Sequence, residues 1–416
     1  MSIEPMVTDI ANGWEFAYVE EHHWPVIQLR NITRSRGGDI VAELDAFCMD
    51  ADAMTPVAGI RFNLTSLQTR GTIAKSLVNG TLDHSLSVVD WDRIIPDVCL
   101  RVMKLYRNGS ASEEIWPSED IILPQFLIKP ILPLHQPCII FGDGGSGKGH
   151  VAMTLSILAA LPYYDNPLGL IVPSEPTNVL YMDYESDRDE FERTLSGLCR
   201  GMKQSVGIKR IQASQKVSVN IEQLRKRVVE DSIGLLVIDS LAPASGGYSN
   251  DPSEPATELY RALRTLPDVT TLIIAHNSKD QDRKKSVYGS IFFSNLARSV
   301  WEVKKSQEVG DDIMEVSLTH RKANRRLELP IGLSYSFDEA INTTTVKTID
   351  LATTSLSDQL PLSFQIKDLL RSGSQTVADI AEILSVTTST ARGTLNRMLK
   401  KEIVVRLKDG EWGLQA

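Results

Sequence analysis

The chain has 416 residues, which is enough for about two or three domains. Hydrophobic residues make up 42% and charged residues 23%, an ordinary composition for a globular protein with a substantial core. With 44 basic and 53 acidic residues the formal net charge is -9, and the pI is about 5.4. This balance excludes a protein that coats nucleic acid by bulk charge, although one patch or one domain could still bind it.

The four cysteines, Cys48, Cys99, Cys138 and Cys199, are far apart and form no CxxC pair. This spacing argues against both a disulfide framework and a zinc site, so reduced thiols in a cytoplasm fit best. The first residues contain no basic segment followed by an apolar run, so we expect no signal peptide. The apolar runs have the length of strands, so we expect no transmembrane helix and a cytoplasmic location.

Residues 1–118 are expected to form an α+β module, in which we find no motif that carries chemistry. The predicted elements are strands at 14–22, 24–32 and 39–49 and helices at 64–80 and 91–109. Gly37 and Gly38 indicate a turn between the last two strands, and Asp90 or Asp92 is a candidate cap for the second helix. A polar, proline-containing linker near 112–125 then leads to the next domain.

Residues 119–352 alternate short apolar strands with amphipathic helices, which predicts a mainly parallel α/β sheet. The predicted strands are 137–142, 177–185, 210–214, 233–240, 271–276, 299–305 and 314–320. The predicted helices between them include 149–161, 189–202 and 254–266. A polar linker over 351–361 precedes a third domain at 362–416, with helices at 363–373, 376–384 and 388–401 and strands at 403–408 and 411–415.

A glycine-rich loop follows the strand at 137–142 and opens a helix, which is the context of a P-loop. Its backbone N–H groups and the helix N-terminus would bind phosphate, and its lysine would reach the β- and γ-phosphates. A glycine stands where the motif normally has the Ser or Thr that contacts Mg²⁺, and the histidine after it is expected to be incidental. The candidate nucleotide contacts are Gly142, Asp143, Gly144, Gly145, Ser146, Gly147, Lys148, Gly149 and His150.

Polar residues end three other strands of the predicted sheet. Asp239 ends a buried strand and is a candidate Mg²⁺ ligand, the alternative being a cap of the next turn. Glu185 ends another strand and is a candidate to orient or deprotonate the attacking water, ahead of Asp183 on the same strand. His276 is a candidate sensor of the γ-phosphate, the alternative being an ordinary histidine at a strand end.

Over residues 125–350 the order of these motifs resembles that of RecA-like ATPases, and in particular the RepA-type plasmid helicases, which are related to DnaB-type helicases. The block Gly289–Arg298 and the basic segment Arg321–Arg325 are similar to segments of that family. The resemblance implies hexameric rings with ATP and Mg²⁺ between subunits, in which Lys148, Glu185, Asp239 and His276 act within one subunit.

In the same resemblance Arg298 matches the arginine finger that reaches the γ-phosphate held by a neighbouring subunit. The alternative is a basic residue that only precedes a strand. Lys322 and Arg325 are further candidates for contacts across the ring, or else part of a solvated face.

Two segments are candidates for DNA contact. The first is the loop at 279–286, where Lys284 and Lys285 could neutralise phosphates, the alternative being a solvated charged loop. The second is the helix at 388–401 of the third domain, which resembles a winged helix and has 8 basic and 6 acidic residues over 362–416. Its outward residues are candidates for bases and phosphates, the alternative being a structural or protein-binding module: Arg392, Asn396, Arg397 and Lys400.

These features predict a ring ATPase that couples ATP hydrolysis to movement on DNA, most sharply a RepA-like replicative helicase of a plasmid, phage or other mobile element. Two alternatives remain open. One is a nucleotide-switched DNA-binding regulator or loader without unwinding activity, which Gly149 favours. The other is an ATP-dependent recombination mediator.

Overall fold

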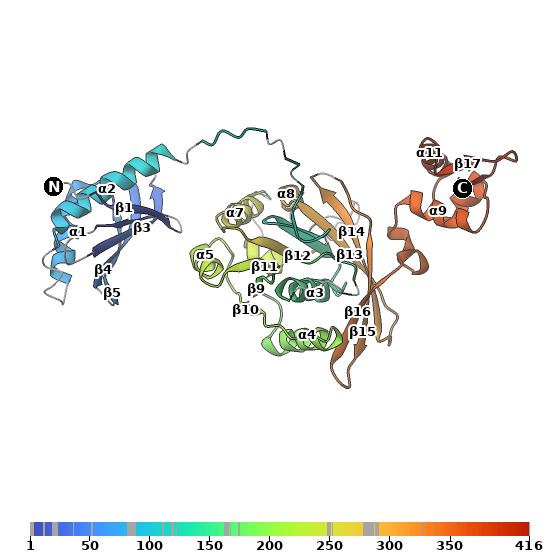
Figure 1. Ribbon diagram of the computed structural model, residues 1–416, viewed down its shortest axis with the longest axis horizontal. Coiled ribbons are helices and arrows are strands. Elements are labelled where there is room, and N and C mark those ends of the chain that lie inside the picture. The colour runs from blue at the N-terminus through green and yellow to red at the C-terminus, as the bar shows by residue number, and fades with distance from the viewer. Residues whose placement is uncertain are drawn as a thin grey trace. The chain divides into compact units, whose positions relative to one another are not determined.

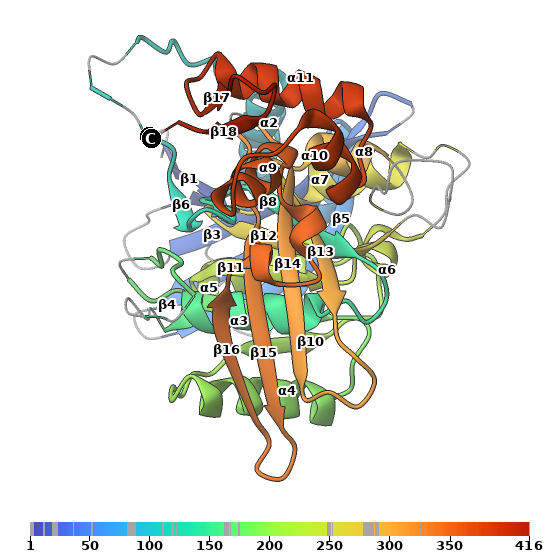
Figure 2. The ribbon, with the colours of Figure 1, turned by 90° about the vertical axis from the view of Figure 1, so that its right-hand side faces the viewer.

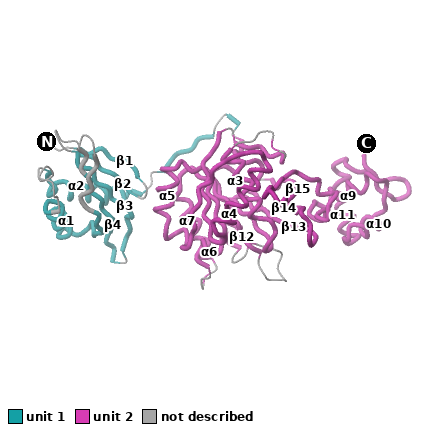
Figure 3. Tube along the Cα trace, turned by 90° about the horizontal axis from the view of Figure 1, so that it is seen from below, with its two compact units in different colours: residues 1–122 teal, residues 123–416 magenta. Residues whose placement is uncertain are grey.

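The computed structural model divides the chain into two compact units, residues 1–122 and 123–416 (Figure 3). Our predicted boundary between the first two domains was 118/119. The proposed third domain belongs to the second unit, so its separation from the ATPase domain stays a prediction. The structure describes residues 4–10, 13–18, 24–35, 37–50, 53–80, 89–109, 112–117, 120–121, 123–161, 166, 168–173, 175–247, 251, 253–277, 287, 291–324 and 326–415.

The first unit is a five-stranded antiparallel meander with two helices. Aromatic and aliphatic side chains from strands and helices share one core, in which Trp91 and Leu44 are fully buried. Asp90 caps the second helix by accepting a hydrogen bond from the backbone N–H of Arg93 at 3.2 Å. The elements are β1 (Met6–Ile10), β2 (Gly13–Ala17), β3 (Trp24–Arg34), β4 (Ile40–Asp50), β5 (Ala53–Asn63), α1 (Leu67–Gly80) and α2 (Trp91–Asn108).

The main sheet of the second unit has nine strands in the order β10-β9-β11-β12-β8-β13-β14-β15-β16 (Figures 1 and 2). The strands from β10 to β13 pair in parallel, and β14 to β16 continue the sheet in antiparallel fashion. The strands are β8 (Pro137–Gly142), β9 (Asn178–Asp183), β10 (Lys209–Gln212), β11 (Ile233–Asp239), β12 (Thr270–His276), β13 (Ser299–Ser306), β14 (Ile313–Ala323), β15 (Ile331–Asp338) and β16 (Thr343–Ile349). A short pair, β6 (Phe126–Ile128) and β7 (Leu132–Pro133), precedes them.

Helices cover both faces of the parallel part, as Figure 1 shows for α3 and α4 on one side and α5 and α7 on the other. Alternate residues of β8 serve the two cores, with Cys138 and Ile140 in one and Ile139 and Phe141 in the other. The helices are α3 (Lys148–Ala160), α4 (Arg188–Gly201), α5 (Ile221–Glu230), α6 (Leu241–Ser245), α7 (Glu254–Leu263) and α8 (Ile291–Leu296). A mainly parallel sheet covered on both faces by helices, with a P-loop after one of its strands, is the α/β architecture of P-loop NTPases, as expected for the predicted RecA-like core.

The strands β15 and β16 were not predicted, although they complete one side of the ATPase core. The β16 strand (TTTVKTI) contains few apolar residues, so its sequence gives a weak strand signal. Its position is set by packing: a Cβ on Gly201 of α4 would lie 2.0 Å from the backbone oxygen of Thr344. Only glycine permits this close approach of the helix to the strand.

The chain continues through two short 3₁₀ helices, η2 (Leu351–Thr353) and η3 (Ser357–Gln359), into three helices and a strand pair. This last group has its own small apolar core, which includes Ile366, Ile380, Leu395 and Trp412. Leu399, the last residue of the helix Thr388–Leu399, is 40% exposed and lies outside this core. The elements are α9 (Leu362–Arg371), α10 (Val377–Ile383), α11 (Thr388–Leu399), β17 (Val404–Arg406) and β18 (Trp412–Leu414).

Candidate active site

The glycine-rich loop lies at the carboxyl end of β8 and leads directly into α3. Gly145 and Gly147 have φ values of 69° and 84°, a left-handed conformation that glycine adopts without strain. Gly142 serves packing, because a Cβ there would lie 2.3 Å from the backbone oxygen of Val303 on β13. The loop is therefore shaped by backbone conformations that larger residues resist, as a phosphate-binding loop requires.

The ammonium group of Lys148 is folded into this loop. It donates hydrogen bonds to the backbone oxygens of Gly142 at 3.1 Å and Asp143 at 2.7 Å, and its side chain is almost fully buried. Burial lowers the pKa of Lys148, while the nearby carboxylates of Asp239 and Glu185 act to raise it. The lysine is held at the loop with its charge directed toward the carboxyl edge of the sheet.

Asp239 ends β11, two strands away from β8, with β12 between them. Its carboxylate accepts a hydrogen bond from the hydroxyl of Tyr181 at 2.9 Å. Burial raises the pKa of Asp239 to about 7; the tyrosine bond opposes this, and the negative charges of Glu185 and Asp183 add to it. A cation at this point would favour the ionised carboxylate and relieve part of that cost.

Glu185 follows the end of β9 and His276 ends β12, with β11 between these two strands, and both side chains lie at the same edge. The Nε2 atom of His276 lies 3.3 Å from Oε1 of Glu185, and the hydroxyl of Ser240 donates to the same oxygen. Both side chains are about half exposed, at 42% for His276 and 48% for Glu185, so water can reach them. The geometry leaves the second oxygen of Glu185 available to a water molecule.

Asp183 has a different environment from Glu185, and our preference for Glu185 stays a prediction. Its carboxylate is fully buried and accepts hydrogen bonds from the backbone N–H groups of Glu185 and Ser186, at 3.0 and 2.9 Å. Its Oδ2 atom pairs with the guanidinium of Arg210 at 2.9 Å. Asp183 thus shapes the turn that positions Glu185.

The structure also places Asn277 at the P-loop, although the sequence analysis did not select this residue. Its side-chain amide donates to Oδ1 of Asp143 at 2.7 Å, and its backbone N–H donates to the oxygen of Gly142 at 3.1 Å. These bonds tie the end of β12 to the start of the P-loop. The only signal in the sequence was its position directly after His276, and no motif distinguishes it from an ordinary residue of the following turn.

Gly149 and His150 follow the lysine on the first turn of α3. Gly149 is exposed and provides no hydroxyl. The ring of His150 packs edge-on against Tyr335 and Phe337 of β15, at centroid distances of 5.8 and 5.3 Å, and burial lowers its pKa. These contacts support packing as the role of His150, and its assignment as a nucleotide contact stays a prediction.

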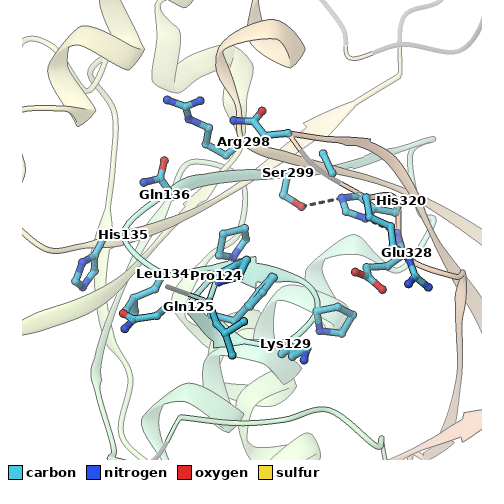
Figure 4. Close-up of a pocket in the computed structure, with 17 residues that line it drawn as sticks. Pro124, Gln125, Lys129, Leu134, His135, Gln136, Arg298, Ser299, His320 and Glu328 are labelled. Carbon is cyan, nitrogen blue, oxygen red and sulfur yellow. Dashed lines mark hydrogen bonds between the residues drawn. The ribbon is translucent and has the colours of Figure 1, made fainter. Parts of the chain in front are cut away.

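Arg298 lies at the opposite edge of the sheet from the P-loop. Its backbone N–H donates to Pro137 at the start of β8, whereas the P-loop follows the end of that six-residue strand. The exposed side chain lines a cavity of about 740 Å³, in which Ser299 lies 3.2 Å from His320 (Figure 4). Lys322 lies nearby and donates to three backbone oxygens at the end of α8, those of Ser294, Asn295 and Ala297.

The candidates for DNA contact are only partly described. Lys284 and Lys285 lie outside the described residues, as does Arg325. On α11, Arg392, Asn396, Arg397 and Lys400 are all exposed. The guanidinium of Arg397 donates to the hydroxyl of Thr394 at 3.0 Å, which holds it along its own helix. Whether any of these residues binds DNA stays a prediction.

Residues 122–282 match the family of AAA domains. The matched residues include the P-loop, Glu185, Asp239 and His276. No curated protein matches the chain. Among solved structures, the crystal structure of a KaiC-like protein from the hyperthermophilic archaeon Pyrococcus horikoshii OT3 is similar to it, with 17% identity over 53% of this chain and 93% of that one and a TM-score of 0.35. Among the described residues no helix is long and apolar enough to cross a membrane.

The residues at the ATPase site fit a nucleotide-bound Mg²⁺. The described part of the chain contains no group of three or more His, Cys, Asp or Glu side chains that could hold a metal ion by itself. Mg²⁺ in nucleotide sites is usually held by one or two carboxylates together with phosphate oxygens and water. Asp239 supplies such a carboxylate at the end of β11, close enough to Lys148 of the P-loop for their charges to interact.

The pKa of Asp239 predicts a pH-dependent cost to stability in the absence of nucleotide and metal. Between about pH 4 and pH 7 the folded chain keeps the proton that the unfolded chain has lost, so stability falls as the pH rises through this window. We expect Asp239→Asn to raise the free energy of unfolding at about pH 8, with no gain at about pH 4. Urea unfolding in EDTA at both pH values measures this. Equal gains at both would contradict the assignment.

Proposed function

We propose that the protein is a ring-forming ATPase that couples ATP hydrolysis to movement on DNA, as a RepA-like replicative helicase of a mobile element, plasmid or phage. The observation that carries the proposal is the distribution of its charged residues over the sheet. Lys148, Glu185 and Asp239 gather at the carboxyl edge, whereas Arg298 projects from the opposite edge. Such a chain offers one half of an ATP site at each edge, and copies arranged in a ring would complete one another.

Within one subunit the described residues can perform the hydrolysis of ATP. The ammonium group of Lys148 can leave the backbone oxygens that it now contacts and bind oxygens of the β- and γ-phosphates instead. Asp239 would hold Mg²⁺, which would neutralise the charge that develops on the phosphates. Glu185 orients a water molecule toward the γ-phosphorus and takes its proton as the bond to the ADP oxygen breaks. His276, in contact with Glu185, would respond to the γ-phosphate.

Arg298 is proposed to act on the nucleotide of a neighbouring subunit. It cannot readily serve its own P-loop, because β8 separates the two ends of the sheet. The described residues show no ion pair for its exposed guanidinium, so it is available to an external anion. A guanidinium presents a planar set of donors that suits the oxygens of a phosphoryl group in transfer. The hexameric ring belongs to this proposal, as does a cytoplasmic location.

The group from α9 to β18 is proposed to be a winged helix that contacts DNA. In support, α10 and α11 adjoin each other, a strand pair follows, and α11 exposes Arg392, Asn396 and Lys400. Residues of these types can bind base edges and phosphates in the major groove. A structural or protein-binding role for the same group is the alternative.

A second candidate function is a nucleotide-switched DNA-binding regulator or loader that does not unwind DNA. Gly149 favours it, because the usual hydroxyl ligand to Mg²⁺ is missing and hydrolysis could be slow. A recombination mediator would share these features. All of these candidates would use the same nucleotide site, and they differ in whether ATP hydrolysis drives strand separation or a change in DNA binding or assembly.

Two substitutions separate nucleotide binding from catalysis. We expect Lys148→Ala to abolish ATP binding and hydrolysis, because the loop loses its only buried cation among the described residues. We expect Glu185→Gln to bind ATP normally and to hydrolyse it about 100-fold or more slowly, since it cannot accept the proton. Lys226→Ala, on the exposed face of α5, is the control. Unchanged turnover in Lys148→Ala would disprove the nucleotide site.

Mixing experiments test the role of Arg298 across subunits. We expect Arg298→Ala and Lys148→Ala subunits, each inactive alone, to recover part of the ATPase rate when mixed, because the intact P-loop of the first then meets the intact Arg298 of the second. Arg371→Ala, an exposed arginine in α9, should keep the wild-type rate by itself and serves as the matched control. ATPase rates across a series of mixing ratios provide the measurement. No recovery at any ratio would show that Arg298 does not act across subunits.

A strand-displacement assay, run beside an ATPase assay, distinguishes the helicase from the second candidate. We expect single-stranded DNA to stimulate hydrolysis and the protein to separate a forked duplex in the presence of ATP and Mg²⁺. The Glu185→Gln variant should bind the fork without separating it. Stimulated hydrolysis with no strand separation would reject the helicase and favour the regulator, loader or mediator.

A further inference from the structure

Tyr181 lies on β9 and belongs to the apolar core on the α3 and α4 side of the sheet. Its side chain is only 3% exposed, and its ring meets that of Phe191 on α4 edge-on, with a centroid distance of 5.1 Å and an interplanar angle of 75°. The guanidinium of Arg210 on β10 lies 5.4 Å from the centre of the Phe191 ring. Packing therefore fixes the direction in which the phenol ring of Tyr181 points.

The hydroxyl at the end of this ring reaches Asp239 on the neighbouring strand. In the parallel pairing of β9 with β11, Tyr181 lies beside Val237, and Asp239 is two residues further along the same face of β11. The hydroxyl donates to Oδ2 of Asp239 at 2.9 Å, since a phenol keeps its proton at neutral pH and an ionised carboxylate only accepts. Tyr181 is thus a core residue whose polar atom contacts the carboxylate of the ATPase site.

This hydrogen bond holds one oxygen of Asp239 and leaves the other for a ligand. Within the described part of the chain no hydrogen bond reaches Oδ1 of Asp239. The residue is partly exposed, unlike Tyr181, so an ion can reach it. The buried side of the carboxylate is therefore fixed by the core, and the remaining oxygen is available at the surface of the site.

The glycine at position 149 makes the direction of this carboxylate more important. A P-loop usually has Ser or Thr after its lysine, and that hydroxyl contacts the Mg²⁺ of the nucleotide. Gly149 has no such group, so a larger share of the metal contact passes to Asp239. Residues that hydrogen-bond to a metal-binding carboxylate fix its orientation, and their loss typically costs about 10- to 100-fold in metal affinity or activity.

We propose that Tyr181 is a positioning residue for Asp239, whose hydroxyl holds one carboxylate oxygen so that the other can bind the Mg²⁺ that accompanies ATP. The inference rests on the ATPase function proposed above and adds the residue through which the core orients the metal-binding group. Tyr181 acts through Asp239 and touches neither the nucleotide nor the metal. If the tyrosine only filled the core, its hydroxyl would have no effect on metal binding.

The ring of Tyr181 has a separate role in the same region. Phe191, which packs against it, also packs against Arg210, and Arg210 pairs with Asp183 and donates to the backbone oxygen of Ser186 at 2.6 Å. These contacts support the turn that carries Glu185. A substitution that keeps the ring and removes only the hydroxyl therefore leaves this turn in place and isolates the bond to Asp239.

Replacing Tyr181 by phenylalanine is such a substitution. Calorimetric titration of the full chain with ADP, once with Mg²⁺ and once with EDTA, gives the gain in affinity that the metal provides. We expect Tyr181→Phe to reduce this gain about tenfold, because the carboxylate is no longer held in one direction, and to keep the affinity for metal-free ADP within about twofold. Tyr260→Phe removes another buried hydroxyl, which donates to the backbone oxygen of Phe293 at 2.9 Å, and as the matched control it should keep the wild-type gain.

A metal-dependent gain that is unchanged in Tyr181→Phe would overturn the inference. An equal loss of ADP affinity with and without Mg²⁺ would overturn it too, because such a loss indicates a role in the fold alone. Electron paramagnetic resonance of free Mn²⁺, titrated into the ADP-saturated chain, measures the metal directly and should show the same weakening. Failure of the proposed function looks different, because then the wild type would not bind ADP or Lys148→Ala would bind it as tightly as the wild type does.

Discussion

The site depends on the burial of one ammonium group among backbone oxygens and carboxylates. Lys148 sits at the point where β8 ends and α3 begins, so its position is fixed by the core on both sides. Desolvation disfavours its charge, and the negative charges of Asp239 and Glu185 compensate. Burial also disfavours the ionised form of Asp239 and raises its pKa. The site is thus an assembly of like and unlike charges that a phosphate and a cation together would balance.

Sheet topology decides which residues meet in this assembly. In a parallel sheet all carboxyl ends lie at one edge, so residues that end separate strands are brought together whatever their distance along the chain. Glu185, Asp239 and His276 are collected in this way. The same rule places Arg298, which precedes β13, at the other edge. If Arg298 completes the site of a neighbouring copy, as proposed, the association is head-to-tail, and one contact repeats around a ring.

The sequence predicted those elements whose residue pattern along the chain directly reflects their burial in the fold. Continuous apolar runs such as β8, β11 and β12 indicated buried parallel strands. The residues that follow these runs indicated the candidate site, because the carboxyl ends of parallel strands lie at the same edge of the sheet. Asp90 was one of the two residues predicted as the cap of α2, the other being Asp92, since capping is local. The P-loop needed only its glycines, its lysine and the elements on either side.

What could not be predicted depends on contacts between distant segments. The strand β16 is polar and is fixed in place by α4 through the absence of side chains at Gly197 and Gly201. In the first unit, β1 is largely exposed and β5 contains proline and glycine, so neither showed a clear strand pattern. The bond between Asn277 and Asp143 joins residues 134 positions apart. Residues 351–359 were expected to be only a polar linker, and their contacts with the sheet depend on Ser306 of β13 and Gly332 of β15.

Gly142 allows the start of the P-loop to lie directly against β13. The residue was expected to contact phosphate, and its lack of a side chain also allows the backbone oxygen of Val303 to approach the loop. Three residues further along β13, Ser306 accepts a hydrogen bond from Ser355, which follows the sheet in the chain. An added methyl group at position 142 would therefore push β13 away from the P-loop and shift the strand to which Ser355 is bonded. One glycine thus sets the spacing between the phosphate-binding loop and the strand beside it.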